Sequence, residues 1–309
     1  MVLSLPGLLK YDLFCLKLRL IRSATIHHYS FVMITKIIIA LLLISIPFAG
    51  KCQQDTSGGY KLVWADEFNK KGAPDPANWK FESGFVRNNE DQWYQEQNAI
   101  CRGGKLIIEA QRVHMANPGY TPNSTNWKQK RQFINYTSSS INTRGKRSFQ
   151  YGRFIMRGRI STDAGLWPAF WTLGIDKPWP SNGEIDIMEY YRNMLLANIA
   201  CGTEAPYKAK WYSNNKKLNT FKANWSKKFH TWRMDWDKNS ISLYVDDLLL
   251  NHVELKDLVN QDGSQFNPFM QPHYLLLNLA IGGDNGGDPS GTKFPKRFEV
   301  DYVRVYQKN

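Results

Sequence analysis

Short runs in which apolar and polar residues alternate recur from about residue 55 to the end of the chain, and helical periodicity is scarce. A period of two places successive side chains on opposite faces of a strand, whereas a helix would repeat every three to four residues. Gly, Asn, Asp and Pro bound most of these runs, as is typical of turns between strands. The runs that predict strands are 60–68, 105–113, 138–146, 151–160, 167–174, 230–250, 273–282 and 298–306.

Many short strands without helices predict an all-β protein, built as a sandwich or jelly roll of two antiparallel sheets. The run 230–250 predicts a hairpin that turns at Lys238–Asn239, and the polar run 114–135 predicts a long loop. No repeat with a period of about 20–50 residues occurs, which excludes a repeat array. A chain of this length can bury one large core, so we expect a single domain over residues 55–309.

The segment NGEIDIMEYY (182–191) carries three carboxylates in an otherwise apolar run. Residues two apart share a face of a strand, so Glu184 and Asp186 point to the same side, but strict alternation would turn Glu189 into the core. One extra residue, a β-bulge near Ile187–Met188, would bring all three acids to one side. Bulges are common beside active sites, and the spacing therefore predicts that the three acids converge on one object.

Two tryptophans lie just upstream, in GLWPAFWTLG (165–174). In a strand, Trp167 and Trp171 face one way while Phe170 faces the other, toward the core. Sugars have flat apolar faces that pack on aromatic rings, so the two indoles predict a stacking platform for a glycan. The alternative is that both rings simply fill the core between two sheets. The neighbouring carboxylates favour the platform.

Two other segments attract attention. RNNEDQWYQ (87–95) mixes polar and aromatic residues as glycan clefts do, although an ordinary polar turn before a strand can have the same composition. LNLAIGGDNGGDPS (277–290) ends a strand in a glycine-rich turn without a following helix, which argues against a phosphate-binding loop. The six histidines form no metal-spaced pair, and we expect no metal site among them.

The first 52 residues differ from the rest of the chain. Met33 begins MITKIIIALLLISIPFAGKC, a lysine followed by an apolar run that is short for a membrane span and typical of a secretory signal. We expect translation to start at Met33, with residues 1–32 upstream of it and the protein exported; a true N-terminal membrane anchor is the alternative. Lipid attachment at Cys52 stays open, because Lys51 matches a lipoprotein signal poorly.

The chain carries a formal net charge of +13, of which the first 52 residues contribute +5. A basic surface favours anionic partners such as nucleic acid or sulfated glycans. The cations are scattered, however, with KQKRQ (128–132) as the only tight cluster, so we favour an ordinary solvated surface and expect no nucleic-acid partner. Downstream of the predicted signal only Cys101 and Cys201 remain, and whether they form a disulfide stays open.

The motif GEIDIMEYY, preceded by GLWPAFWTLG, resembles glycoside hydrolase family 16, whose catalytic signature is E-x-D-x-x-E in its bulged form. The resemblance extends along the chain through LVWADEF, NNEDQWY, INTRGKRSFQYGRFIMRGRI, QPHYLLLNLAIGG and VDYVRVYQ. It implies a β-jelly roll with a concave substrate cleft that cleaves internal β-linkages of glucans or galactans with retention of configuration. It also implies a monomer without a required cofactor or stable protein partner, and it leaves a structural calcium ion open.

By this resemblance, Glu184 is expected to be the nucleophile, Glu189 the general acid/base and Asp186 the auxiliary acid. A retaining enzyme needs one ionised and one protonated carboxyl, so the pKa of Glu189 must be raised. The remaining residues that the resemblance or the cleft assignment makes candidates for substrate binding are Trp167, Trp171, Asn89, Arg87, Gln271 and Asn278.

The sequence leaves the substrate open between β-galactans and β-glucans, with other linkages as a further alternative. WPAFW resembles the laminarinase-like branch, which acts on β-1,3-glucans, but LLANIACGTE lacks the histidine of the H-G-T segment usual in that branch. RNNEDQWYQ and EYYRNMLLAN look closer to galactan-cleaving relatives that act on agar-type polymers or O-glycans. Arg87 and Arg192 would suit an anionic chain. A non-catalytic glycan-binding jelly roll is the alternative function, although such proteins often lose one of the three acids.

Overall fold

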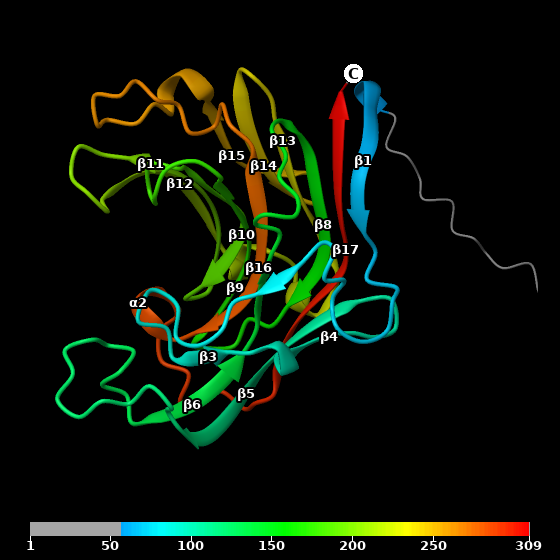
Figure 1. Ribbon diagram of the computed structural model, residues 1–309. Helices are drawn as coiled ribbons and strands as arrows, with labels where there is room; N and C mark the ends of the chain where they lie inside the picture. Colours follow the sequence, from blue (N-terminus) through cyan, green and yellow to red (C-terminus); the bar gives the residue numbers. More distant parts are fainter. Residues whose placement is uncertain (1–56, 309) are drawn as a thin grey trace, which may run out of the picture. The chain divides into compact units, whose positions relative to one another are not determined.

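The computed structural model describes residues 57–308, which form two facing β-sheets (Figure 1). The larger sheet has β15 at one edge and β3 at the other, while β1 pairs with β17 and β4 with β5. Its strands, in order, are β15 (Leu248–Glu254), β14 (Ser240–Val245), β13 (His230–Trp236), β8 (Gly152–Ile160), β17 (Lys296–Lys308), β5 (Leu106–Ala116), β6 (Phe133–Ser138) and β3 (Gln92–Tyr94), with β1 (Tyr60–Asp66) and β4 (Ala99–Cys101) beside them.

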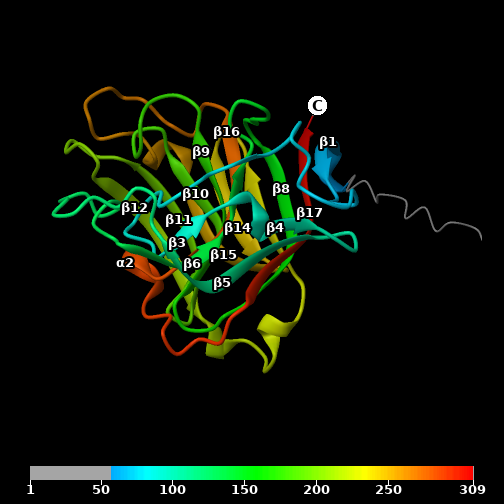
Figure 2. The ribbon, with the colours of Figure 1, turned by 60° about the horizontal axis from the view of Figure 1, so that its bottom comes forward.

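The second sheet carries the acidic segment. Among the described strands its pairings are all antiparallel, and in the larger sheet β3 and β6 pair in parallel. Its strands, in order, are β12 (Ala209–Lys217), β11 (Met194–Gly202), β10 (Glu184–Tyr191), β9 (Leu166–Gly174), β16 (His273–Ile281), β7 (Ser140–Asn142) and β2 (Lys80–Phe81). Figures 1 and 2 both show β11 and β12 on the opposite side of the molecule from β1 and β17.

The core lies between the two sheets. In β8 buried and half-buried residues alternate along the whole strand, as a period of two requires when one face packs inward. From the second sheet Phe170, Ile185 and Ile187 are fully buried in the same apolar cluster as Trp232 and Met234 of β13. This arrangement confirms the predicted all-β jelly-roll sandwich, and it leaves the outer face of the second sheet available for a cleft.

The short helices are minor elements. Among the described residues they comprise the 3₁₀ turns η1 (Ser57–Gly59), η2 (Glu96–Asn98), η3 (Leu218–Thr220), η4 (Trp225–Lys227) and η5 (Leu255–Asp257), and the single turn α2 (Gly283–Gly286). No helix in residues 57–308 is long and apolar enough to cross a membrane. The predicted signal, the start at Met33 and Cys52 lie outside the described residues.

Three details of the sequence prediction were wrong or incomplete. The predicted loop 114–135 is shorter, because β5 continues to Ala116 and β6 begins at Phe133. The predicted strand 138–146 is interrupted, since only residues 140–142 belong to β7 and a turn follows. The predicted 230–250 hairpin is present as β13 and β14, and β15 adds a second hairpin to it.

Cys101 and Cys201 are both buried and both free thiols, so they form no disulfide.

Candidate active site

A β-bulge in β10 places the three acids on one face, as the sequence predicted. On β9, Trp171 and Phe170 are consecutive, yet they pair with Asp186 and Met188, so Ile187 is the extra residue on β10. Ile187 and Met188 both point into the core and are at most 1% exposed. Beyond the bulge Glu189 therefore returns to the face that carries Glu184 and Asp186, where all three line one recess.

Burial shapes the protonation of these acids. Asp186 is 3% and Glu189 8% exposed, whereas Glu184 is half-buried. The pKa of Glu189 is raised to about 8, chiefly by burial; hydrogen bonds from Trp167 and Asn198 oppose this rise, and the nearby charge of Glu184 adds to it. At neutral pH Glu189 is therefore largely protonated.

Glu184 and Asp186 differ in the contacts that counteract the effect of burial on the pKa. Burial raises the pKa of Glu184 too, but hydrogen bonds with Trp179 and Asp186 and the charge of Arg87 favour its ionised form. The pKa of Asp186 lies well above its usual value, because of burial first and then the charges of Glu189 and Glu184. Of the three acids, Glu184 therefore has the contacts that most favour the ionised form.

Asn198 on β11 joins two of the acids. Its Nδ2 donates to Oε2 of Glu189 at 2.8 Å and to Oδ2 of Asp186 at 3.2 Å. Asn198 stands directly opposite Asp186 in the β10–β11 ladder and is 5% exposed. Our sequence analysis missed this residue, although a single Asn within the apolar run LLANIAC was a usable signal, because a polar side chain buried in a strand needs a partner.

The two predicted platform tryptophans line the cleft and also contact its polar groups. Trp167 donates its indole N–H to Oε1 of Glu189 at 2.7 Å, and Trp171 donates to Oδ1 of Asn278 at 2.7 Å. Both rings border the main cavity, whereas Phe170 between them is fully buried in the core. The predicted facing is confirmed, but the rings are only 6% and 8% exposed. They are thus tightly packed walls of the cleft.

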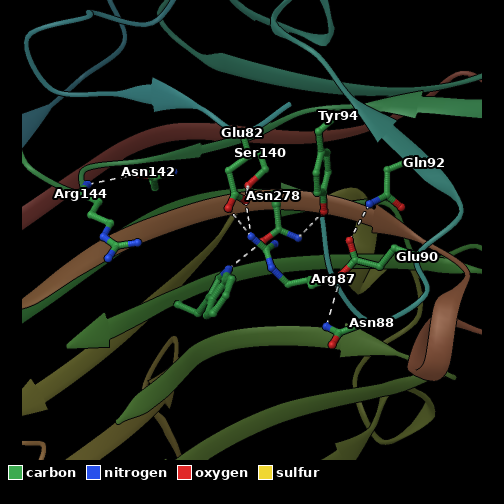
Figure 3. A network of polar contacts seen from close by, with 11 residues as sticks. Glu82, Arg87, Asn88, Glu90, Gln92, Tyr94, Ser140, Asn142, Arg144 and Asn278 are labelled. Atoms are coloured by element: carbon green, nitrogen blue, oxygen red, sulfur yellow. Dashed lines mark hydrogen bonds and ion pairs between the residues drawn. The ribbon is translucent and has the colours of Figure 1, made fainter. Parts of the chain in front are cut away.

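Arg87 belongs to a network of polar side chains (Figure 3). Its guanidinium pairs with Glu82 and lies over the ring of Trp171, with 5.2 Å to the ring centroid. Glu82 also accepts a hydrogen bond from the hydroxyl of Ser140 at 2.6 Å. Asn278 extends this network by donating to the hydroxyl of Tyr94 at 3.2 Å. Arg87 lines the cleft as predicted, but its charge is already neutralised by Glu82.

Glu90 is a fourth acid near the site. It is 2% exposed, accepts a hydrogen bond from Nε2 of Gln92 at 2.7 Å, and has a pKa raised chiefly by burial. A narrow recess of about 40 Å³ has Glu90, Asp186 and Glu189 in its wall. The acid therefore lies beside the three acids of β10, in a part of the cleft with room for about one water or hydroxyl.

The main cavity has a volume of about 760 Å³ and spreads over strands β9 to β12. Trp179 is a second residue that our sequence analysis missed, although it stands only five positions before Glu184 in WPSNGE. Its indole donates to Oε2 of Glu184 at 2.6 Å. The lining residues are Arg87, Asn88, Trp167, Trp171, Leu173, Trp179, Glu184, Glu189, Tyr191, Met194, Leu196, Asn198, Trp211, Ser213, Asn215 and Asn285.

Asn89 was predicted to bind substrate, but it lies outside the lining of the main cavity. Asn89 turns away from the cavity and donates to Oδ1 of Asp284 at 2.9 Å, and its neighbour Asn88 lines the cavity instead. Both asparagines have positive φ, so the turn rotates away from the course of a regular strand. Arg192, named as a possible anion contact, is also outside the cavity lining, and it donates to the backbone oxygen of Asp284 at 3.1 Å.

Gln271 serves the loop between β9 and β10 and does not line the cavity. It is 4% exposed, accepts from the backbone N–H of Asp176 and donates to the carbonyl of Asn182. The contact is so close that a Cβ at Gly174 would lie 2.3 Å from Nε2 of Gln271. Both the oxygen and the nitrogen of its amide thus bind the backbone of the loop.

Within residues 57–308 no group of three or more His, Cys, Asp or Glu side chains is arranged to hold a metal ion. His273 illustrates the structural use of the histidines: its two ring nitrogens contact Thr172 and the carbonyl of Pro268, and burial lowers its pKa to about 4.

Comparison with known proteins identifies the class that this fold and site define. The family model of glycosyl hydrolases family 16 matches residues 88–304. A beta-glucanase of Rhodothermus marinus is 33% identical over 282 residues, which cover 86% of this chain and 92% of that protein. The chain belongs to glycosyl hydrolases family 16, and it is an endo-acting glycoside hydrolase.

Solved structures agree with this assignment. One comes from work on endo-acting O-glycanases with which members of the human gut microbiota initiate mucin breakdown; it matches with a TM-score of 0.74 and 35% identity, covering 82% of this chain and 92% of that one. The laminarinase catalytic domain of Thermotoga maritima MSB8 matches with a TM-score of 0.68 and 29% identity, covering 81% and 99%.

Proposed function

We propose that the protein is a retaining endo-β-glycosidase in which Glu184 is the nucleophile and Glu189 the general acid/base. The observation that carries this proposal is the pair of unequal carboxyls on one face of β10. Glu189 is buried and protonated at neutral pH, while Glu184 faces Arg87 and accepts a hydrogen bond that favours its charge. Retaining glycosidases need this division of labour between two acids.

The reaction would proceed in two displacements. First, an oxygen of Glu184 bonds to the anomeric carbon while the glycosidic C–O bond breaks and the leaving oxygen takes the proton of Glu189. Then a water loses a proton to Glu189 as its oxygen attacks the anomeric carbon, and the ester bond to Glu184 breaks. Asp186 stays protonated in this scheme and hydrogen-bonds Glu184. Carboxyls and water complete both steps, so we propose that no cofactor takes part.

For the substrate we propose a β-galactoside linkage of the O-glycan type. The O-glycanase structure supports this choice, because it matches with a higher TM-score and identity than the laminarinase domain. A β-1,3-glucan is the second candidate, supported by the 33% identity to a beta-glucanase. The pairing of Arg87 with Glu82 removes one reason to expect a sulfated chain. We also propose that the protein is exported, on the strength of the apolar run after Met33.

The test is release of reducing ends from mucin O-glycans, keratan, agarose, porphyran, laminarin and lichenan. We expect the highest kcat/KM on a galactoside chain and a product that initially keeps the β-configuration, as proton NMR can follow. Inversion would exclude the two-step mechanism. Best activity on laminarin would decide for the glucan.

Two variants test the roles of the acids. Glu184→Gln should lose at least about 10³-fold in rate while it still binds glycan, because the amide cannot attack. Glu189→Gln should lose most on natural linkages and less on aryl glycosides with activated leaving groups. If Glu184→Gln keeps more than a tenth of the activity, Glu184 is not the nucleophile. Binding of every glycan without turnover by the unaltered protein would support a glycan-binding protein.

A further inference from the structure

Trp179 lies in the connection between β9 and β10, and its indole reaches back to Glu184. Nε1 donates a hydrogen bond to Oε2 of Glu184 at 2.6 Å. The side chain is 38% exposed and lines the main cavity together with the carboxylate. An indole nitrogen can only donate, so this contact is directed at a lone pair of the acid and favours its ionised form.

The loop that carries Trp179 is fastened at both ends, although the ring itself is exposed. Gln271 accepts from the backbone N–H of Asp176 at 2.8 Å and donates to the carbonyl of Asn182 at 3.0 Å. Asn260 donates to the carbonyl of Ser181 at 2.8 Å. These side chains are buried, so water does not compete for the bonds. The backbone on both sides of Trp179 is therefore held in place by buried hydrogen bonds.

Besides Trp179, the hydrogen bond with Asp186 and the charge of Arg87 favour the ionised form of Glu184. On the neighbouring strand β11 the residue opposite it is Ala200, which offers no polar side chain, and on β9 it is Leu173. The titratable and charged groups that act on it from the surrounding elements are Asp186 and Glu189 of β10, Arg87 before β3 and Tyr274 of β16. Of these only Arg87 is a cation, and it is paired with Glu82.

We propose that Trp179 is a positioning residue for the nucleophile: its indole N–H holds one oxygen of Glu184, which fixes the plane of the carboxylate and stabilises its negative charge. This inference rests on the proposed role of Glu184. It gives the β9–β10 loop a task in the reaction, in addition to forming a wall of the cleft. It also explains the otherwise structural clamp made by Gln271, because a loose loop would leave the carboxylate free to rotate.

The test replaces Trp179 by Phe, which keeps a ring at the cavity wall and removes the N–H. The pH dependence of kcat/KM on the best glycan is the readout. Loss of a hydrogen bond to the ionised form raises the pKa of Glu184, so the acid limb should move to higher pH by roughly half a unit to one unit. Around that limb the rate should fall about tenfold, while the alkaline limb should keep its position.

Trp211→Phe is the matched control. Trp211 lines the same cavity and is 45% exposed, and among the contacts of residues 57–308 it makes no hydrogen bond to an acid. This variant should change KM by loss of ring area and leave the acid limb in place. An equal shift of the limb in both variants would contradict the inference, as would a Trp179→Phe profile that is lower at every pH by one factor.

Failure of this inference is distinguishable from failure of the proposed function. If Glu184→Gln is inactive while Trp179→Phe leaves the acid limb unmoved, Glu184 remains the nucleophile and Trp179 does not position it. If Glu184→Gln is active, the proposed function fails first. The melting temperature of Trp179→Phe completes the test. Because the ring is exposed, the substitution should change this temperature little, and any loss of rate is then measured on folded protein.

Discussion

Trp167 and Glu189 form one hydrogen-bonded unit, in which the indole N–H of the cleft wall donates to Oε1 of the buried acid at 2.7 Å. The ring is therefore more than a surface on which a sugar could stack. It orients the proposed acid/base and, because the bond favours the ionised carboxylate, it opposes the effect of burial on the pKa of Glu189, which is raised to about 8 in all. Substitution of Trp167 should thus change the chemistry of Glu189 as well as glycan binding.

Trp167→Phe tests this coupling. The variant keeps a ring but loses the N–H, so the pKa of Glu189 should rise above its value of about 8. The alkaline limb of kcat/KM should move to higher pH, and kcat should fall because the acid is less well oriented. Trp171→Phe is the control, since that indole donates to Asn278 and not to an acid. An alkaline limb that stays in place in Trp167→Phe would contradict the coupling.

The features that follow from local periodicity were predictable from the sequence. The bulge at Ile187–Met188 and the facing of Trp167 against Phe170 both come from the period of two within a single strand. The exposure of the aromatic platform was harder to foresee. Whether a cleft-facing ring is open or tightly packed depends on the residues of neighbouring strands, and both tryptophans proved nearly buried.

The rest of the site depends on pairings between distant segments. Asn198 reaches the acids only because β11 pairs with β10 in one register, and Trp179 because a loop folds back. Asn88, in place of Asn89, lines the cavity because two successive residues of that turn have positive φ. No strand period predicts such a turn, and the same holds for Gln271, whose loop partners are about ninety residues away in sequence.

Stability should depend on pH through Glu189. Its folded-state pKa is about 8, above its ordinary value of 4.5, so the unfolded chain loses this proton at lower pH than the folded protein. The stabilising contribution of the protonated form is complete below about pH 4.5 and is lost as the pH rises through about 8. The free energy of unfolding should therefore decrease across this window. The raised pKa of Asp186 acts in the same direction.

Glu189→Gln should remove that dependence, since the amide does not titrate. Its melting temperature should exceed that of the unaltered protein at pH 8, and the difference should shrink at pH 5. Glu204→Gln, which changes an exposed acid outside the cavity, is the control and should follow the unaltered protein. If the melting temperature of Glu189→Gln differs from that of the unaltered protein by the same amount at pH 5 and at pH 8, the burial of Glu189 carries no such penalty.

Asn198→Ala should remove the two hydrogen bonds through which the amide bridges Asp186 and Glu189. Glu189 becomes ionised as it gives its proton to the leaving group, and a hydrogen bond to a charged group contributes about 1.5–3 kcal/mol. We therefore expect kcat to fall roughly ten- to a hundredfold with a smaller change in KM. The pKa of Glu189 should also rise, because Asn198 stabilises its ionised form. Asn215→Ala, which alters the same cavity without touching an acid, should act mainly on KM. The same kcat loss in both variants would contradict a bridging role.

Deletion of Met188 tests whether the bulge is needed for the site. Asp186 and Glu189 pair with Trp171 and Ala169 of β9, and only Phe170 lies between those two partners. Removing Met188 leaves Ile187 as the single residue opposite Phe170, so β10 regains a regular ladder. With one residue fewer, Glu184, Asp186 and Glu189 again share a face by simple alternation, and their separation along the strand is still set by β9.

We therefore expect the deletion variant to keep activity within about tenfold of Met188→Ala, which retains the bulge and loses only the side chain. Both variants remove a side chain that is 1% exposed, which should cost about 2–5 kcal/mol of unfolding free energy. Chemical denaturation measures that loss, and kcat on the best glycan is then compared on the folded fraction. Activity in Met188→Ala but none in the deletion variant would mean that the bulge aims Glu189, and that matching the positions on β9 does not suffice.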